Sequence, residues 1–137
     1  MNHFDYMHRV RYADTDKMGI SYYANYFVWF EAARTEYFRA LGLPYTECEK
    51  QGFFLPVVET GARYLAPSTY DDLLTVRTSV SEFTKTSMRF EYQVFSAAEK
   101  LLVTGFSVHV FVDRALKPTR IPDEIRSRVT LFRLLKD

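Results

Sequence analysis

Apolar positions in the first third of the chain repeat with the period of a helix. From about Tyr22 to Leu41, rings and aliphatic side chains recur at positions 23, 26, 27, 30, 37, 38 and 41, which is the spacing of one helical face. At 1.5 Å per residue, this helix would be about 30 Å long. Gly42, followed by Leu43 and Pro44, is a typical stop signal. The pattern therefore predicts one long helix.

Positions on both sides of this helix alternate instead, which is typical of strands. Before the helix, residues 7–13 alternate, and after it the period becomes two, first over residues 54–66 up to Pro67. Apolar residues at alternating positions mark three further strands: Leu74, Val76 and Val80; Met88, Phe90, Tyr92 and Val94; Phe106, Val108, Val110 and Val112. Five strands are thus expected.

The order of these elements limits the fold class. Two shorter helices are expected, over residues 46–51 and 123–134. A strand, a long helix and four consecutive strands suit an antiparallel meander, so we expect an α+β fold of two layers. Residues 1–137 contain neither a repeat nor a linker and are expected to form one domain. One helix covers only one face of such a sheet, so the edge strands and the opposite face favour association with a second copy.

Composition excludes several classes of partner. The chain has 18 Lys plus Arg against 17 Asp plus Glu, so no overall field favours nucleic acid or an anionic membrane. No apolar run approaches the roughly 18 residues of a membrane span, and the N-terminus lacks the pattern of a signal peptide. With 12 Phe, 10 Tyr and one Trp, some rings are expected at subunit interfaces or in an apolar groove.

Cysteine and histidine positions argue against several kinds of chemistry. The single cysteine, Cys48, excludes an internal disulfide and fits a reducing compartment, so the cytoplasm is expected. His3, His8 and His109 are too scattered for a metal site or a catalytic triad, and no metal or cofactor is expected. For His109, inside a strand, a structural role is expected. His3 and His8, near the terminus, are expected to be exposed.

Candidate catalytic groups gather in the acidic turn before the long helix. Asp14 and Asp16 have a purely structural explanation, because Asp-x-Asp before a turn often bonds its own backbone or caps the next helix. Gly19, however, permits a tight bend that brings the helix start, expected at Ser21 to Tyr23, back to the carboxylate. Amide groups that open a helix carry partial positive charge and bind oxyanions. The turn therefore predicts a site suited to hydrolysis of an activated acyl group such as a thioester, with the carboxylate as base or nucleophile.

The same stretch carries a family resemblance. The run Tyr12-Ala13-Asp14-Thr15-Asp16-x-x-Gly19-x-x-x-Tyr23-x-x-Tyr26-x-x-x-x-Glu31-Ala32-Ala33-Arg34 resembles the signature of the 4-hydroxybenzoyl-CoA thioesterase family of hotdog-fold acyl-CoA thioesterases. Residues 57–72 and 84–90 resemble that family too, so the similarity covers nearly the whole chain. It implies an antiparallel five-stranded sheet wrapped around one long central helix, with a short C-terminal helix. It also implies homo-oligomers, dimers or tetramers, with active sites at the subunit interface.

The resemblance assigns roles to three residues of the turn. By position, Asp16 matches the catalytic aspartate, the backbone N–H of Tyr23 matches the donor that polarises the thioester carbonyl, and Gly19 matches the turn glycine. The branch of bacterial enzymes linked to the Tol-Pal envelope system usually has His where this chain has Tyr23, whereas the 4-hydroxybenzoyl branch has Tyr. The branch, and with it the substrate, stays open.

Four further residues are candidates for substrate binding. Tyr26 is expected either in the core or against the acyl chain. Glu59 either orients water or the catalytic aspartate, or pairs with a cation such as Arg63. Lys85 and Arg89 resemble the region that contacts CoA in relatives, and solvated surface charge is the alternative for both.

These residues favour an acyl-CoA thioesterase that hydrolyses a fatty or aromatic acyl-CoA to the free acid and CoA. The alternative is a non-hydrolytic protein that binds acyl-CoA or an acyl carrier, or that acts as a scaffold for an envelope complex. The acidic turn favours catalysis, since binding alone has no evident need for it. A hotdog dehydratase is disfavoured because no His pairs with an acidic residue on the central helix.

Overall fold

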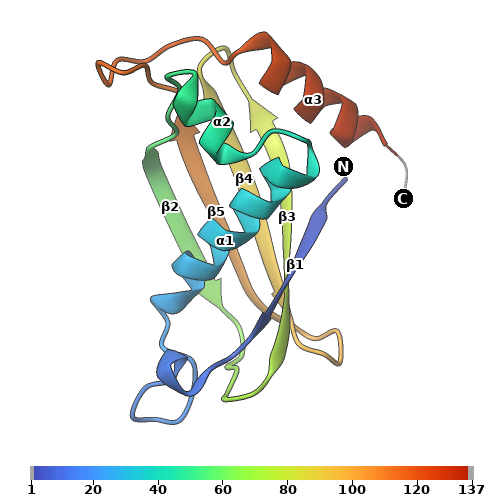
Figure 1. Cartoon of the computed structure of the whole chain (residues 1–137). Helices are drawn as coiled ribbons and strands as arrows, with labels where there is room; N and C mark the ends of the chain where they lie inside the picture. Colours follow the sequence, from blue (N-terminus) through green and yellow to red (C-terminus); the bar gives the residue numbers. More distant parts are fainter. Residues whose placement is uncertain (1, 136–137) are drawn as a thin grey trace.

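The protein is built from one long helix laid across a five-stranded antiparallel sheet (Figure 1). The computed structural model describes residues 2–135. The strand order is β1-β3-β4-β5-β2, which gives the α+β fold expected from the sequence and the five-stranded sheet that the family resemblance implies. The expected meander of four consecutive strands is wrong for β2, which pairs with β5 and not with β3. The elements in chain order are β1 (Phe4–Arg9), a 3₁₀ turn (Tyr12–Asp14), α1 (Asn25–Ala40), α2 (Tyr45–Lys50), β2 (Val57–Tyr64), β3 (Leu73–Phe83), β4 (Ser87–Phe95), β5 (Leu101–Val110) and α3 (Asp123–Leu134).

The aromatic face of α1 forms the centre of the core. Its buried side chains are Tyr26, Trp29, Phe30, Ala33, Tyr37 and Phe38. The Phe30 ring stacks on Tyr92 of β4 at 4.4 Å between centroids. A Cβ added at Gly105 of β5 would lie 2.5 Å from the Phe30 ring, so this glycine lets the helix approach the sheet closely. Each such buried ring stabilises the fold by about 1.5–3 kcal/mol.

Alternation in β3 and β4 places one set of side chains under α1, as the sequence pattern predicts. In β5 the pattern is misleading: Val103, Gly105, Ser107 and His109 are buried, whereas the predicted Phe106, Val108 and Val110 alternate with them and are only half-buried. The buried set on this inner face includes Leu74, Val76, Val80, Met88, Phe90, Val94 and Val103. The edge strand β2 differs, because six of its eight residues are exposed. Among residues 2–135, β2 pairs with β5 along one side and with no strand along the other. The outer edge of β2 is therefore open.

The first strand and the long helix begin at other residues than predicted. β1 covers residues 4–9 rather than 7–13, because the Val10 N–H bonds to Asp72 O at 2.9 Å and the chain then turns. The helix begins at Asn25 rather than Tyr22, because the Tyr22 N–H is held by Asp14 O at 2.9 Å. The turn before α1 is thus longer than the periodicity suggests.

The remaining bounds differ by a few residues. The strand predicted over residues 54–66 is residues 57–64, and the last strand runs from 101 to 110 instead of 106 to 112. The short second helix lies one residue earlier than predicted, and α3 has its predicted bounds. In the part of the chain that the structure describes, no helix is long and apolar enough to cross a membrane.

Candidate active site

A tight hairpin between β1 and α1 carries Asp16 as the first residue of its turn. The Asp16 N–H bonds to Ile20 O and the Gly19 N–H bonds to Asp16 O, each at 2.9 Å. Gly19 has φ of 82°, in the left-handed region that favours glycine. The Thr69 hydroxyl donates to Gly19 O at 2.9 Å. The hairpin is therefore fixed against the loop that precedes β3.

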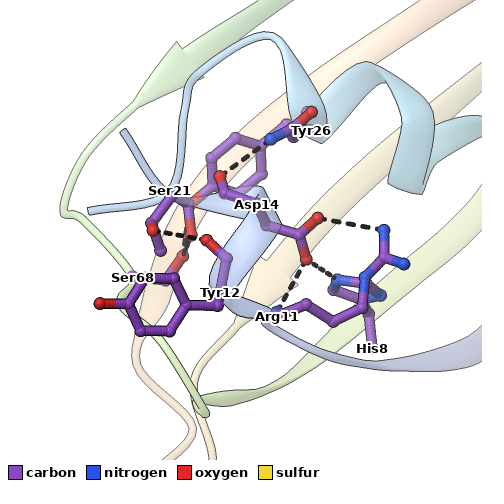
Figure 2. A network of polar contacts seen from close by, with 9 residues as sticks. His8, Arg11, Tyr12, Asp14, Ser21, Tyr26 and Ser68 are labelled. Atoms are coloured by element: carbon purple, nitrogen blue, oxygen red, sulfur yellow. Dashed lines mark hydrogen bonds and ion pairs between the residues drawn. The ribbon is translucent and has the colours of Figure 1, made fainter. Parts of the chain in front are cut away.

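Asp14, the first carboxylate of the motif, is buried and fully engaged (Figure 2). It is 4% exposed, and its oxygens lie 3.0 Å from His8 Nε2, 2.8 Å from the Arg11 backbone N and 3.3 Å from the Arg11 guanidinium. Burial raises the pKa of Asp14, but the hydrogen bonds from Arg11 and His8 outweigh it and hold this pKa below its usual range. His8, expected to be exposed, instead packs its ring 4.4 Å from Trp29. Asp14 and His8 therefore serve the structure.

The backbone of Asp14 also fixes where the long helix begins. Its carbonyl accepts the Tyr22 N–H at 2.9 Å and the Asn25 side-chain amide at 2.8 Å. The Asn25 N–H in turn bonds to Tyr22 O at 2.9 Å. These contacts hold the first residues of α1 directly beside the acidic hairpin.

Asp16, the second carboxylate, is partly exposed and has few partners. Its Oδ1 accepts the Met18 N–H at 2.8 Å, and no other side-chain hydrogen bond to Asp16 occurs among residues 2–135. A hydrogen bond with Tyr23 raises the pKa of Tyr22, and the charges of Tyr23 and Asp16 act in the same direction. The second oxygen of the Asp16 carboxylate therefore has no hydrogen bond in the described part of the chain and is available for chemistry.

Two backbone donors at the start of α1 are unpaired. The Tyr22 and Asn25 N–H groups have the acceptors given above, whereas those of Tyr23 and Ala24 have none in the described part of the chain. Amides in this position point along the helix dipole and bind negative oxygen. Tyr23 and Ala24 can thus supply the donors that stabilise an oxyanion.

A cavity of about 300 Å³ opens beside these donors. Its lining residues are Ile20, Ser21, Tyr23, Tyr26, Tyr64, Leu65, Ala66 and Pro67. Beneath it, Ser68 Oγ lies 2.8 Å from the Tyr26 hydroxyl and 2.6 Å from Ser21 Oγ (Figure 2). Because these buried hydroxyls satisfy one another, the cavity offers mainly apolar and aromatic surface, and its volume suits a small acyl group. Burial raises the pKa of Tyr26, against the bonds to Ser68 and Ser21.

The structure brings only part of the predicted set together. Asp16, Gly19, Tyr23 and Tyr26 lie in the hairpin and at the helix start. Asp16 itself does not line the cavity, although Ile20 of the same hairpin does. Tyr23 and Tyr26 therefore line the cavity, and Asp16 and Gly19 lie in the hairpin that contributes Ile20 to its wall.

The other three predicted residues lie elsewhere in the chain. Lys85 is in the turn after β3, and the 11 residues of that strand place it roughly 35 Å from the acidic hairpin. Arg89 is bound on the sheet, with its Nε 3.0 Å from Glu91 Oε1 and its guanidinium 4.2 Å from the centre of the Phe106 ring. Glu59 is exposed on β2 and has no ion pair, with Arg63 or otherwise, among residues 2–135.

Sequence reasoning did not single out Tyr64 and Ser68 as site residues. The Tyr64 hydroxyl, from the end of β2, donates to the backbone O of Tyr23 at 3.0 Å. Tyr64 directly precedes Leu65, Ala66 and Pro67, and this stretch resembles the thioesterase family. The resemblance was the sequence signal that could have identified Tyr64. Ser68 is a single serine in a loop, and no spacing marks it.

Comparison with known proteins places this geometry in context. The sequence pattern of the thioesterase-like superfamily matches residues 10–129. The acyl-CoA thioesterase YbgC of Haemophilus influenzae is 34% identical over 127 residues, which cover 92% of this chain and 93% of that protein. The acyl-CoA thioester hydrolase YbgC of Escherichia coli O6:H1 is 31% identical over 118 residues, 85% of this chain and 88% of that one.

Solved structures show the same arrangement of elements. The DHNA-CoA thioesterase from Staphylococcus aureus superimposes with a TM-score of 0.92 at 29% identity, covering 97% of this chain and 92% of that chain. The hypothetical protein TT1821 from Thermus thermophilus has a TM-score of 0.89 at 34% identity, covering 93% of this chain and 98% of that chain. The similarity thus extends over nearly all of both chains.

Proposed function

The chain belongs to the thioesterase-like superfamily and is an acyl-CoA thioesterase, and from this premise we propose that it hydrolyses a fatty or aromatic acyl-CoA with Asp16 as its catalytic carboxylate. The thioester carbonyl binds the Tyr23 N–H. The acyl group occupies the cavity beside Tyr26. The observation that carries the proposal is the pair of unpaired amides at the start of α1, next to both the Asp16 hairpin and the cavity.

The chemistry needs only these groups. The Tyr23 and Ala24 amides stabilise the negative oxygen of the tetrahedral intermediate. Asp16 either takes a proton from the attacking water or attacks the carbonyl itself, forming an anhydride that water then hydrolyses. In both routes the C–S bond breaks, CoA leaves as the thiolate and is protonated by solvent, and the acyl group leaves as the free acid. A thiolate is a good leaving group, so no strong general acid is required.

Replacement of Asp16 tests the assignment. Release of CoA thiol is measured for a panel of short, long, branched and aryl acyl-CoAs, with wild type, Asp16→Asn and the control Asp123→Asn. Asp123 is an exposed carboxylate at the start of α3. We expect Asp16→Asn to lower kcat about 10²- to 10⁴-fold, the usual loss for a general base, and Asp123→Asn to match wild type. An Asp16→Asn enzyme with wild-type turnover would refute the proposal.

A single turnover in ¹⁸O-labelled water tests the anhydride route for Asp16. With enzyme in excess, label found in the Asp16 carboxylate by peptide mass spectrometry, together with an unlabelled acid, shows that Asp16 attacked the thioester and that water opened the anhydride at the Asp16 carbonyl. Label confined to the released acid excludes that path and leaves direct attack by water, or an anhydride opened at the acyl carbonyl.

We further propose that the enzyme acts as a homo-oligomer, a dimer or tetramer, paired along the open edge of β2. Val57 and Val58 on that strand are 48% and 59% exposed, and an unpaired hydrophobic edge favours strand pairing with another copy. Glu59 lies on the same strand. Lys85 is too far from Asp16 of its own chain, and Arg89 lies opposite Glu82 near the same end of β3, so their proposed contact with CoA is made in the partner's site.

Mixing two impaired variants tests whether two copies share one site. Asp16→Asn and the double variant Lys85→Ala, Arg89→Ala are each expected to be impaired, the first in kcat and the second in KM. If a site combines Asp16 of one chain with Lys85 and Arg89 of another, a mixed oligomer regains one complete site and part of the activity. Light scattering should show at least a dimer. A monomer with full activity would contradict the proposal.

We also propose a cytoplasmic location. Cys48 is buried and unpaired, and burial raises the pKa of its thiol, so it has the character of a structural side chain in a reduced protein. Cell fractionation with a tagged chain tests this.

A further inference from the structure

The contact between Tyr64 and the helix start has no role in the mechanism described so far. Tyr64 is the last residue of β2, opposite Val103 of β5. Its hydroxyl donates to the carbonyl oxygen of Tyr23 at 3.0 Å, and its ring meets those of Tyr23 and Tyr26 at 6.1 and 5.6 Å between centroids. Tyr64 therefore connects the edge strand with the peptide that opens α1.

This hydrogen bond acts on one of the two unpaired amides. The carbonyl of Tyr23 and the N–H of Ala24 belong to the same peptide group. Within α1 that carbonyl accepts only the Tyr26 N–H, at 3.3 Å, so the bond from Tyr64 is the shorter of the two. A hydrogen bond to the oxygen of an amide polarises the group and strengthens its N–H as a donor. The same bond also fixes the plane of the peptide and hence the direction of the Ala24 N–H.

Resting on the function proposed above, we infer that Tyr64 is a positioning residue for the oxyanion site: its hydroxyl orients and polarises the Tyr23–Ala24 peptide, so that the Ala24 N–H serves as a second oxyanion donor beside the Tyr23 N–H. The Tyr64 hydroxyl donates its hydrogen bond to the backbone carbonyl of Tyr23. Its ring contributes separately, as a wall of the cavity. Removal of the hydroxyl alone should therefore affect the transition state more than substrate binding.

The variant Tyr64→Phe removes the hydroxyl and keeps the ring. Complete loss of an oxyanion donor costs about 10²- to 10³-fold in kcat, and since Tyr64→Phe only weakens and loosens one donor, we expect kcat to fall roughly 3- to 10-fold. KM should stay within twofold. The matched control is Tyr70→Phe, because Tyr70 is an exposed tyrosine outside the proposed site. Its ring centroid lies 5.2 Å from that of Tyr12.

A spectroscopic measurement separates this role from a structural one. In the Asp16→Asn background, which holds the thioester intact, the carbonyl stretch of bound benzoyl-CoA labelled with ¹³C at the carbonyl is recorded by infrared difference spectroscopy. Labelled hexanoyl-CoA replaces it if the wild-type enzyme does not hydrolyse benzoyl-CoA. Donors at the oxygen move the band to lower wavenumber, so adding Tyr64→Phe should move it back towards the free thioester. Adding Tyr70→Phe should leave it in place.

The outcomes distinguish this inference from the proposed function. If Asp16→Asn keeps wild-type turnover, the proposed function fails. If Asp16→Asn is impaired but Tyr64→Phe changes neither kcat nor the carbonyl band, the inference about Tyr64 alone is overturned. A Tyr64→Phe enzyme with raised KM and an unchanged band would also overturn it, because the hydroxyl would then act by contact with the substrate. A lower kcat with a displaced band supports it.

Discussion

The acidic hairpin and the interior of the sheet both contain a series of polar groups, but these groups are hydrogen-bonded to different extents in the two regions. In the interior, the Arg34 guanidinium donates to the Tyr92 hydroxyl at 2.9 Å, which lies 2.6 Å from Ser107 Oγ. Ser107 Oγ is 2.8 Å from His109 Nε2, and His109 Nδ1 is 2.9 Å from Leu55 O. Between the two ends of this interior chain, Tyr92, Ser107 and His109 each have a partner on both sides.

The hairpin leaves groups open where solvent and substrate reach them. Asp16 has one hydrogen bond to its carboxylate, and the Tyr23 and Ala24 amides have none among residues 2–135. A saturated and buried network stabilises one conformation and has no capacity to bind anything new. Unsaturated donors and acceptors beside a cavity can bind a substrate oxygen. The difference explains why His109 is structural although histidine is a common catalytic residue.

The largest expected effect on the interior chain comes from acid. Burial lowers the pKa of His109 to about 4, and the Arg34 guanidinium acts in the same direction, against the bond to Leu55 O. Below the ordinary pKa of 6.5 the unfolded state therefore binds more protons than the folded state, so the free energy of unfolding falls as pH falls from about 6.5 to 4. At about 1.4 kcal/mol per pH unit, the loss at pH 4.5 is about 3 kcal/mol relative to pH 7.5.

Urea unfolding of wild type and His109→Asn at these two pH values measures this contribution. Carboxylates elsewhere respond to acid in both proteins, so only the difference between them reports on His109. We expect the variant to be less stable at pH 7.5 and to lose less on acidification. An equal loss of the free energy of unfolding in both proteins would show that His109 has the same pKa in the folded and unfolded states. The interior chain would then not disfavour protonation of His109.

The next largest effect concerns the two carboxylates of the hairpin. Asp14→Asn removes the charge that accepts from His8 and Arg11, and hydrogen bonds to a charged group contribute about 1.5–3 kcal/mol. We expect the free energy of unfolding at pH 7 to fall by about 2 kcal/mol while kcat falls far less than in Asp16→Asn. Because the pKa of Asp14 is lowered by folding, this stabilisation is present at neutral pH and lost in acid.

Chemical denaturation and thiol release, measured on both variants, complete this comparison. Asp16→Asn should keep its stability within about 0.5 kcal/mol, as most partly exposed positions do. The reverse pattern, with Asp14 essential for turnover and Asp16 for stability, would exchange their roles and contradict the proposed mechanism.

Sequence periodicity predicts the fold well because burial follows a simple repeat. The helical repeat of rings and the alternation in β3 and β4 both correspond to side chains that pack between helix and sheet. In β5 the apolar set is the half-buried one, because the buried positions are occupied by Gly105, Ser107 and His109 as well as Val103. Element ends were missed where backbone hydrogen bonds decide them. Residues 10–13 continue an alternating pattern although the Val10 N–H already bonds outside β1, and the ring of Tyr23 continues the helical spacing before the helix begins at Asn25.

The acidic hairpin could be predicted from its local composition, but its partners could not. Carboxylates, a glycine and a helix start follow one another within a few residues, so spacing alone brings them together. His8 contacts Asp14 across a turn, and the shape of this turn cannot be predicted from the periodicity of apolar positions. Tyr64 reaches Tyr23 only because β2 lies at the edge of the sheet beside the helix start, which is a property of the topology.

The smallest expected effect distinguishes the backbone of Tyr23 from its side chain. Tyr23→Ala keeps the N–H that binds the carbonyl and removes a ring that is 58% exposed and that lines the cavity. Because the donor is main chain, we expect kcat to fall by less than about tenfold, well short of the loss in Asp16→Asn, with KM raised for acyl groups that contact the ring. Steady-state kinetics on the acyl-CoA panel measures both parameters. A loss in kcat as large as that of Asp16→Asn would mean that the phenol itself takes part, and that the unpaired groups of the hairpin include a side chain as well as amides.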